Sequence, residues 1–286
     1  MIRKAVVPAA GLGTRLFPAT KEQPKEMLPI FSSSFNNEMV VKPVVQTVYE
    51  QLFNAGLREF CFVVGRGKRA IEDHFTPDTG CVRLLEGMGR NGQAMDLESF
   101  YGKLEASTIM WVNQPEPKGF GNAVLMAQSF VENEQCLVHA GDSFIISKKM
   151  DYIEKLLSGH KRFDADAAFV ALEIENPRQY GIIEGVEVET GIFRVKNAVE
   201  KPEKPATNLA IMAMYVFKPV IFEALKATKP GVNGEIQLTD AIQKLIDWGL
   251  GVYAVKLDEN YGHLDIGSPQ RYWAALDMSH RHSCRR

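Results

Sequence analysis

Two glycines and two cations near the start of the chain could bind phosphate. Gly11 and Gly13 follow a short β-branched run, and Arg15 and Lys25 come after them in the segment VVPAAGLGTRLFPATKEQPKEMLP. Glycines let backbone N–H groups approach an anion without a Cβ in the way. Arg15 and Lys25 could then neutralise the bound charge. The order of these residues predicts a strand, a phosphate loop and a lysine.

Read alone, GLGTR is also compatible with an empty tight turn or with a dinucleotide loop. The dinucleotide motif GxGxxG needs a third glycine where this chain has Leu16. A Walker loop needs a G-K-[ST] sequence, which is missing here. Both common nucleotide motifs therefore fail for this segment.

Two aspartates, Asp142 and Asp265, lie at the ends of apolar runs further along the chain. In open α/β sheets, ligands bind beside the carboxyl ends of the strands, which is where these aspartates are expected to lie. Mg2+ usually takes one or two carboxylates together with phosphate oxygens and waters. Taken singly, each aspartate is better explained as a turn or helix cap, and it is the two together that favour a metal site.

Apolar runs and amphipathic patterns alternate along the chain. We predict strands near residues 5–7, 59–65, 108–112, 136–140, 165–172, 210–217 and 252–256, with antiparallel strands in 181–199. We predict helices near residues 44–56, 69–75, 121–130, 220–227, 239–248 and 270–278. This rhythm predicts an α/β fold, a three-layer Rossmann-like arrangement with a mixed, mainly parallel sheet and helices on both faces.

Length and composition indicate one globular domain. The chain has 286 residues, of which 45% are hydrophobic and 24% charged, with a formal net charge of -2. This charge gives no general attraction to nucleic acid or to an anionic membrane, and we predict neither as a partner. The four cysteines show no CxxC spacing, and the start lacks an apolar signal segment, which together predict a cytoplasmic location.

Three polar or basic segments receive structural interpretations. Ser32 to Met39 is expected to be a flexible surface loop, and His280 to Arg286 a frayed tail. Gly65 to Arg69 could be a second anion loop, but we favour a basic turn before a helix.

The segment from Gly11 to Pro29 resembles the signature of the sugar-phosphate nucleotidyltransferases, GxGTRLxPxTxxxPKxxLP. The resemblance continues in order through nearly the whole chain, in KPVVQ, IEDHF, QP with GFGNA, GD, QYG, VEKP, GEIQLTDA and LDIG. It implies a nucleotidyltransferase fold similar to that of the glycosyltransferase-A enzymes. It further implies a nucleotide-binding half at residues 1–145 and a sugar-binding half at 146–280, and a homo-oligomer, either dimer or tetramer.

The combination of IEDHF, VEKP and GEIQLTDAI is most similar to family members that use UTP and glucose 1-phosphate. The implied reaction gives UDP-glucose and pyrophosphate by in-line attack on the α-phosphorus, with Mg2+ as cofactor. Two polyanions must meet in it, and unit like charges at about 4 Å repel by roughly 4 kcal/mol at an effective dielectric of 20. Catalysis should therefore rest on positioning and fixed cations, and no nucleophile motif is needed.

The resemblance also assigns roles in phosphate binding. It makes Arg15 and Lys25 the catalytic cations, with Lys25 bridging the α-phosphate and the sugar phosphate. It assigns the binding of the nucleotide and its phosphates to Ala10, Gly11, Gly13 and Thr14. It gives Mg2+ to Asp142 and Asp265, although Ser143 replaces a second aspartate that is frequent in relatives.

For the base, the resemblance points to Gln114 and Gly119. A glutamine amide offers the donor and the acceptor that match the O4 and N3–H edge of uracil. Thymine presents the same edge with one methyl group more, which is worth only about 1–3 kcal/mol of discrimination. UTP and dTTP both remain open at this point. Asn122 replaces a histidine that is common in this motif.

For the sugar phosphate, the resemblance points to Gly181, Glu200 and Lys201. A carboxylate can accept two sugar hydroxyls while the neighbouring ammonium meets the phosphate. Gly181 would let the sugar approach the backbone. As an isolated dipeptide, Glu200-Lys201 would be an ordinary surface ion pair.

Two alternatives to uridylyl transfer remain open. One is a thymidylyltransferase that acts on the same sugar phosphate. The other is a regulatory relative that binds nucleotide sugars without turnover. Such a protein is expected to lose Arg15, Lys25, Asp142 or Asp265, and all four are present.

Overall fold

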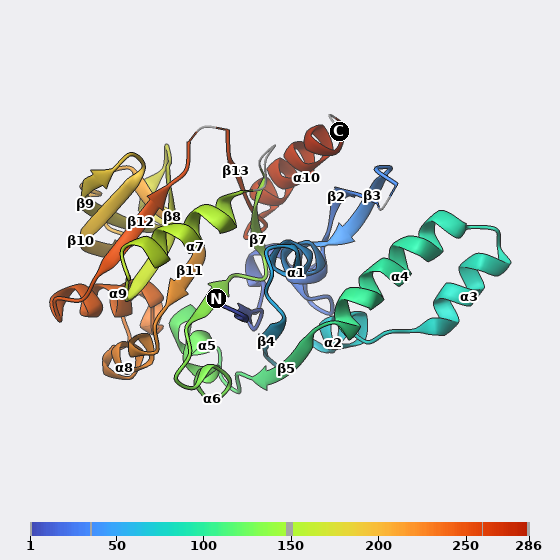
Figure 1. The fold of residues 1–286 in the computed structure, drawn as a ribbon, viewed down its shortest axis with the longest axis horizontal. Helices are drawn as coiled ribbons and strands as arrows, with labels where there is room; N and C mark the ends of the chain where they lie inside the picture. Colours follow the sequence, from blue (N-terminus) through green and yellow to red (C-terminus); the bar gives the residue numbers. More distant parts are fainter. Residues whose placement is uncertain (1, 35, 147–150, 259, 285–286) are drawn as a thin grey trace.

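The β-branched run before the glycines forms a strand in the middle of a large sheet. The computed structural model describes residues 2–34, 36–146, 151–258 and 260–284. Its central sheet has nine strands (Figure 1). Their order is β5 (Thr108–Asn113), β4 (Glu59–Val64), β1 (Lys4–Pro8), β6 (Cys136–His139), β11 (Leu209–Phe217), β8 (Ala167–Glu173), β12 (Val252–Lys256), β10 (Ile192–Glu200) and β9 (Gly181–Glu189).

The sheet is mixed and mainly parallel, as predicted. Strands β5, β4, β1 and β6 are parallel neighbours, and β12 is parallel to β8. Strands β10 and β11 run antiparallel to the strands beside them. It follows that β10 and β11 point one way and the other strands of this sheet point the opposite way. The carboxyl ends of β1, β4, β5 and β6 consequently meet along one edge.

Alternation along β1 explains why both faces of the sheet are covered. Val7 packs into a core on one face and Val6 into a core on the other, and both are fully buried. The first face is covered by α1 (Val44–Asn54), α2 (Arg69–His74), part of α4 (Asn91–Glu105) and α7 (Tyr152–Arg162). The second face is covered by α5 (Phe120–Met126), α6 (Gln128–Val131), α8 (Val220–Ala227) and α9 (Leu238–Asp247). The predicted three-layer α/β arrangement is confirmed.

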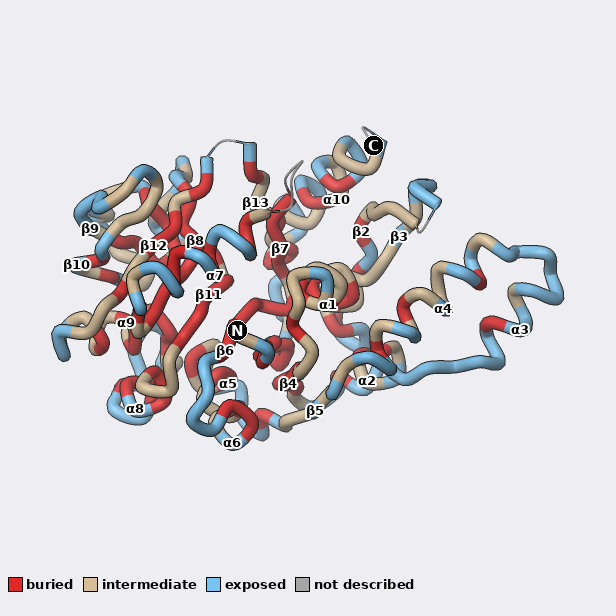
Figure 2. The backbone as a smooth tube through the Cα atoms, viewed as in Figure 1, coloured by how far each residue is buried: buried red, intermediate tan, exposed pale blue. Residues whose placement is uncertain are grey.

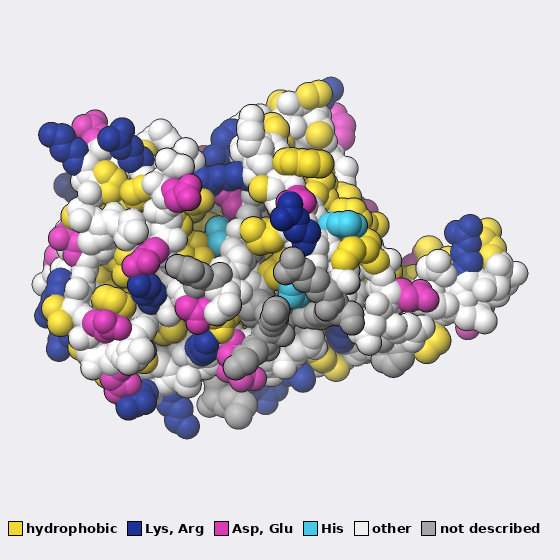
Figure 3. All heavy atoms as spheres, turned by 90° about the horizontal axis from the view of Figure 1, so that it is seen from above, with side chains coloured by type: hydrophobic (Ala, Val, Ile, Leu, Met, Phe, Trp, Pro, Cys, Tyr) yellow, Lys and Arg dark blue, Asp and Glu magenta, His cyan; other side chains and the backbone are white. Residues whose placement is uncertain are grey.

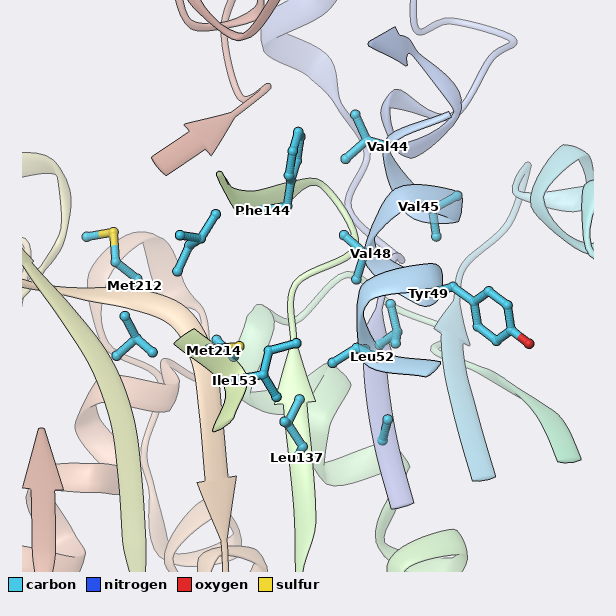
Figure 4. Packing of buried hydrophobic residues seen from close by; sticks show 14 of the residues in the cluster. Val44, Val45, Val48, Tyr49, Leu52, Leu137, Phe144, Ile153, Met212 and Met214 are labelled. Atoms are coloured by element: carbon cyan, nitrogen blue, oxygen red, sulfur yellow. The ribbon is translucent and has the colours of Figure 1, made fainter. Parts of the chain in front are cut away.

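The core under α1 shows how distant segments of the chain are joined. Figure 4 shows Leu52 of α1 in the same cluster as Leu137 of β6 and Ile153 of α7. Phe144 lies in the same cluster and comes from β7 (Ser143–Ile146), which pairs with β13 (Gly262–Asp265). Packing of this cluster fixes β7 and β13, and therefore the two predicted metal ligands beside them.

A helical arm that the sequence analysis did not identify projects from the body. It consists of α3 (Thr79–Gly87) and α4, and it extends away from the sheet in Figure 1. Most of α3 is exposed in Figure 2. Leu84 and Met88 are 59% and 60% exposed, so the arm presents apolar side chains to its surroundings.

Two predictions about polar segments were wrong. Ser32, Ser33 and Met39 lie in strands, because β2 (Pro29–Ser33) pairs with β3 (Met39–Pro43) in a hairpin. The expected frayed tail is helical to Ser283, at the end of α10 (Pro269–Ser283), and residues 285–286 lie outside the described residues. The hairpin and the helix support each other, since Ser279 of α10 accepts a hydrogen bond from Phe31 N at 3.3 Å.

The described residues also form four short 3₁₀ turns: η1 (Thr14–Leu16), η2 (Lys25–Met27), η3 (Pro177–Gln179) and η4 (Val232–Gly234). Among the described residues, no helix has the length and apolar character needed to cross a bilayer.

Candidate active site

The glycine segment follows the carboxyl end of β1. Ala9 N donates to Val63 O at 2.8 Å, so the segment begins beside β4. Gly13 has a φ of 67°, a left-handed conformation that favours glycine, and it precedes η1. Thr20 Oγ1 donates to Gly13 O at 2.8 Å and closes the turn. The predicted phosphate loop is therefore an ordered loop at the edge where strands end.

A cavity of about 410 Å3 lies against this loop. It is lined by all eight residues that the sequence analysis assigned to the nucleotide and to catalysis: Ala10, Gly11, Gly13, Thr14, Arg15, Lys25, Gln114 and Gly119. A second cavity of about 820 Å3 adjoins it. The five remaining predicted residues line this second cavity: Asp142, Gly181, Glu200, Lys201 and Asp265.

The two cavities share the residues at their junction. Thr14, Arg15, Phe120, Asp142 and Glu235 line both. Two ligands, one in each cavity, would therefore meet beside Thr14, Arg15 and Asp142. This geometry suits a reaction in which a group passes from one bound molecule to another.

Lys25 and Asp142 form an ion pair at this junction, although 117 residues separate them in the chain. Burial lowers the pKa of Lys25, but Asp142 and Glu26 outweigh it, so the pKa is raised overall. For Asp142, burial raises the pKa, but the attraction of the adjacent Lys25 is stronger and holds the pKa below its usual value. Both groups are therefore charged at neutral pH, so a cation and a carboxylate face the cavities.

A second ion pair lies behind the first. Lys68 Nζ is 2.6 Å from Glu26 Oε2, and the two residues are only 6% and 1% exposed. Burial raises the pKa of Glu26, and the attraction of Lys68 opposes this shift. The segment from Gly65 to Arg69 is a basic turn before α2, as favoured, and Arg66 and Arg69 in it are exposed. Sequence reasoning missed the burial of Lys68, because nothing local distinguishes it from its exposed neighbours.

The orientation of Gln114 limits how it can bind a base. Gln114 is 5% exposed, and its Nε2 donates to Asn122 Oδ1 at 2.8 Å and to Gly119 O at 3.2 Å. Both hydrogens of the amide are therefore used within the protein, and only Oε1 is left as an acceptor. The sequence analysis expected Gln114 to offer both a donor and an acceptor to the base. In the structure only the acceptor, Oε1, remains for that role. Asn122, noted as a departure from the motif, is what orients the amide.

Gly119 is packed against a distant segment. It has a φ of 103°, and a Cβ on it would lie 2.7 Å from Glu235 Cβ and 2.8 Å from Ile236 O. Gly121 N also donates to Ile236 O at 2.9 Å. Glycine is required at residue 119 because a side chain would collide with the Glu235 segment. The GEIQLTDA motif therefore forms a wall of the site.

In the second cavity, Gly181 and Glu200 are opposite each other in the β9–β10 ladder. Thr239 Oγ1 donates to Glu200 Oε2 at 2.7 Å, and Lys201 Nζ lies 3.0 Å from Glu200 Oε1. Lys201 has a φ of 44°, which is uncommon for a residue with a side chain. Glu200 is thus held on both oxygens, with its ammonium neighbour beside it.

Asp265 reaches the same cavity from the end of β13. Asp265 Oδ1 accepts a hydrogen bond from Gly267 N at 2.7 Å, and Oδ2 pairs with Arg271 of α10. A Cβ on Gly267 would lie 3.1 Å from Arg15 Nη2, so Arg15 is also close to this aspartate. Sequence reasoning missed Arg271, which lies in the first turn of α10.

The two aspartates are suitable for a divalent metal ion. Ile266 N donates to Asp142 O at 3.3 Å, so the ends of β7 and β13 hold the two residues side by side. Both carboxylates are hard oxygen donors that face the second cavity, and each is balanced by one cation. Among the described residues there is no cluster of three or more metal-binding side chains. Two carboxylates completed by phosphate oxygens and waters are the set that Mg2+ prefers.

The model of the nucleotidyl transferase family matches residues 4–281 of the chain. The chain belongs to the nucleotidyl transferase family. A UTP–glucose-1-phosphate uridylyltransferase from Bacillus subtilis is 41% identical to this nucleotidyl transferase over 252 residues, which are 85% of this chain and 80% of that protein.

Solved structures agree with this assignment. A crystal structure of UDP-glucose pyrophosphorylase complexed with UDP-glucose is similar with a TM-score of 0.84 and 32% identity, over 98% of this chain and 99% of that one. The UTP-bound UGPase from Acinetobacter baumannii is similar with a TM-score of 0.83 and 28% identity, over 97% of this chain and 93% of that one. The predicted nucleotidyltransferase fold is confirmed.

Proposed function

We propose that this nucleotidyl transferase transfers a uridylyl group from UTP to glucose 1-phosphate, giving UDP-glucose and pyrophosphate. The observation that carries the proposal is the pair of adjoining cavities with Lys25 and Asp142 at their junction. The relative from Bacillus subtilis supports the choice of UTP and glucose 1-phosphate. The neighbours with bound UDP-glucose and UTP support the same choice.

UTP occupies the 410 Å3 cavity in this proposal. Backbone N–H groups around Ala10, Gly11 and Gly13 bind its phosphates, and Thr14 contributes a hydroxyl. Gln114 Oε1 accepts the N3–H of uracil, and Gly119 N–H donates to O4. This assignment follows from the use of Gln114 Nε2 within the protein.

Glucose 1-phosphate occupies the 820 Å3 cavity. Glu200 accepts hydrogen bonds from sugar hydroxyls, and Lys201 pairs with the phosphate. Gly181 leaves room for the sugar, because a Cβ there would lie only 2.6 Å from Thr239 Oγ1. The sugar phosphate then points towards the junction.

The reaction needs no covalent enzyme intermediate. An oxygen of the sugar phosphate attacks the α-phosphorus of UTP, and the bond from that phosphorus to the β-phosphate oxygen breaks, so pyrophosphate leaves with the electron pair. Lys25 turns from Asp142 to the phosphates and neutralises charge shared by the two substrates. Arg15 stabilises the pyrophosphate that leaves. Positioning and fixed charge are the whole contribution of these side chains.

We propose Mg2+ as the cofactor, held by Asp142 and Asp265. When bound, it neutralises phosphate charge and orients the triphosphate. The donor chemistry of the two carboxylates supports this choice over a softer metal, because hard divalent cations prefer oxygen ligands. Asp142, now paired with Lys25, would hold the ion together with Asp265 once Lys25 turns to the substrate phosphates.

We propose that residues 1–145 serve mainly the nucleotide and residues 146–280 mainly the sugar. Most residues around the smaller cavity come from the first range, and only Glu235 and Gly267 come from the second. The larger cavity is lined mostly by the second range. Strands from both ranges belong to one sheet, so the two halves form a single folded unit.

We propose that the chain works as a homo-oligomer, a dimer or a tetramer. The apolar side chains on the projecting arm support this, and hydrophobic residues are visible there in Figure 3, at the right. An apolar groove of about 500 Å3 between the β2–β3 hairpin and α4 is a further surface of this kind. Sedimentation velocity on the purified protein tests the proposal, and a monomer at micromolar concentration would contradict it.

We also propose that the protein works in the cytoplasm, as predicted, and the choice of UTP as substrate supports this.

Pyrophosphate release tests the proposed function. The enzyme is supplied with Mg2+, glucose 1-phosphate and either UTP or dTTP, with the nucleotide alone as control. We expect turnover with UTP to exceed turnover with dTTP. Equal or greater turnover with dTTP would favour the thymidylyltransferase alternative, and binding of UDP-glucose without turnover would favour the regulatory alternative.

A further inference from the structure

A buried ion pair lies directly behind the cation of the proposed reaction. Glu26 follows Lys25 in the turn η2, and Lys68 precedes α2 on a different part of the chain. Their charged atoms are 2.6 Å apart and both side chains are almost fully buried. Arg66 and Arg69, the other cations of the same segment, are exposed.

Stability alone does not account for this pair. Desolvating two charges costs about as much free energy as their attraction returns, and apolar residues of similar volume often stabilise a fold equally well or better. Glu26 lines the nucleotide cavity, and Lys68 reaches the site through its contact with Glu26. Gly65, in the same segment as Lys68, packs against Ala10 of the phosphate loop. A role in the site is therefore the more economical explanation.

The pair fixes the turn that carries Lys25. In η2, Met27 N donates to Pro24 O at 2.9 Å and Leu28 N donates to Lys25 O at 3.0 Å. Consecutive residues of this tight turn bind different partners, Lys25 binding Asp142 and Glu26 binding Lys68. Holding Glu26 against the start of α2 thereby sets the direction in which Lys25 leaves the turn.

Lys25 needs such an anchor during the reaction. Its own ion pair with Asp142 must open when the substrates bind, and the Glu26–Lys68 pair does not take part in that exchange. We propose that Lys68 is a positioning residue, which acts through Glu26 to keep the Lys25 turn in place while Lys25 moves from Asp142 to substrate phosphate. The proposal rests on the function proposed above.

Four variants separate positioning from folding. Lys68→Met removes one charge, and Lys68→Arg keeps it. The double variant Glu26→Leu/Lys68→Met replaces the pair by apolar side chains. Arg66→Met is the matched control, an exposed cation of the same segment. For each variant, pyrophosphate release gives kcat and the KM for UTP, and a melting curve gives the thermal midpoint. Hydrogen–deuterium exchange without substrate gives the exchange rates of the Met27 and Leu28 amides.

We expect Lys68→Met to lower kcat by roughly 10- to 100-fold with the KM for UTP unchanged, since small misplacements of a catalytic group cost that much. Lys68→Arg should recover most of kcat, and Arg66→Met should match the wild type. The double variant should melt near the wild-type midpoint, keep a low kcat and exchange the Met27 and Leu28 amides faster.

Two results would overturn the inference: wild-type kcat in the double variant, or unchanged exchange at Met27 and Leu28. Failure of the proposed function would look different, because the wild-type enzyme itself would then release no pyrophosphate from UTP and glucose 1-phosphate. The exchange measurement needs no turnover and would still decide whether the pair holds the turn.

Discussion

Replacing Gly181 by alanine should damage sugar binding and spare nucleotide binding. A Cβ at this position would lie 2.6 Å from Thr239 Oγ1 and 3.1 Å from Glu200 Oε2, whereas relaxed non-bonded contacts are about 3.5–4.0 Å. Because Thr239 Oγ1 donates to Glu200 Oε2 at 2.7 Å, the methyl group must displace this bonded pair. A hydrogen bond to a charged group contributes about 1.5–3 kcal/mol, so kcat/KM for glucose 1-phosphate should fall roughly 10- to 150-fold.

The assay is pyrophosphate release, with each substrate varied at a saturating concentration of the other. The KM for UTP should stay at the wild-type value in Gly181→Ala. Gly102→Ala is the control, because a Cβ on Gly102 meets nothing within 4 Å. The single variant Thr239→Ala removes the same hydrogen bond to Glu200 without adding a methyl group and should show a loss of similar size. An unchanged kcat/KM for the sugar phosphate, or an equal loss with UTP, would refute the reasoning.

Three further predictions concern charge. Lys25→Met should lower kcat by roughly 1,000-fold, since a charge pair at about 4 Å contributes about 4 kcal/mol at an effective dielectric of 20; an effect confined to KM would reduce Lys25 to a binding residue. Asp142→Asn and Asp265→Asn should move the Mg2+ titration of activity to higher concentration, and an unchanged midpoint would contradict the metal assignment. Burial lowers the pKa of His139 to about 4, below the usual value of about 6.5. Between these two pH values the unfolded chain binds a proton at this histidine that the folded chain does not bind. The free energy of unfolding should therefore fall as the pH drops from about 6.5 to 4. Urea denaturation of the wild type and of His139→Gln at pH 7 and pH 5 measures this, and equal slopes for the two proteins would show that His139 is not the cause.

The phosphate loop could be predicted because its signals are local. A β-branched run predicts β1, and the glycines after it predict a turn that can approach phosphate. The carboxyl ends of neighbouring parallel strands must share one edge of the sheet, so Asp142 could be expected near this loop. The other residues that line the cavities were predicted from the resemblance to the sugar-phosphate nucleotidyltransferases.

The buried charges could not be predicted, because their surroundings come from distant segments. Lys68 and Glu26 are 42 residues apart, and their sequence neighbours include exposed cations. Arg271 reaches Asp265 only because α10 packs beside β13. A charged side chain is buried only when an oppositely charged partner is close to it. A single sequence does not show which distant residues will form such a pair.

The projecting arm was missed for a different reason. Helix α4 buries only Ala94, Phe100 and Leu104 among its fifteen residues. A helix with so narrow an apolar face gives a weak periodic signal. Gln114 illustrates a third limit, since the residue type offers both a donor and an acceptor, and the contact with Asn122 removes the donor.

Transfer of labelled phosphorus tests the central claim most directly. The enzyme is incubated with Mg2+, glucose 1-phosphate and UTP labelled at either the α- or the γ-phosphate, and the products are separated by chromatography. The two-cavity site with Lys25 at its junction predicts that the α label appears in UDP-glucose and the γ label in pyrophosphate, with no label on the protein. Label that stays in UTP, or that becomes bound to the protein, would contradict direct transfer between the two cavities.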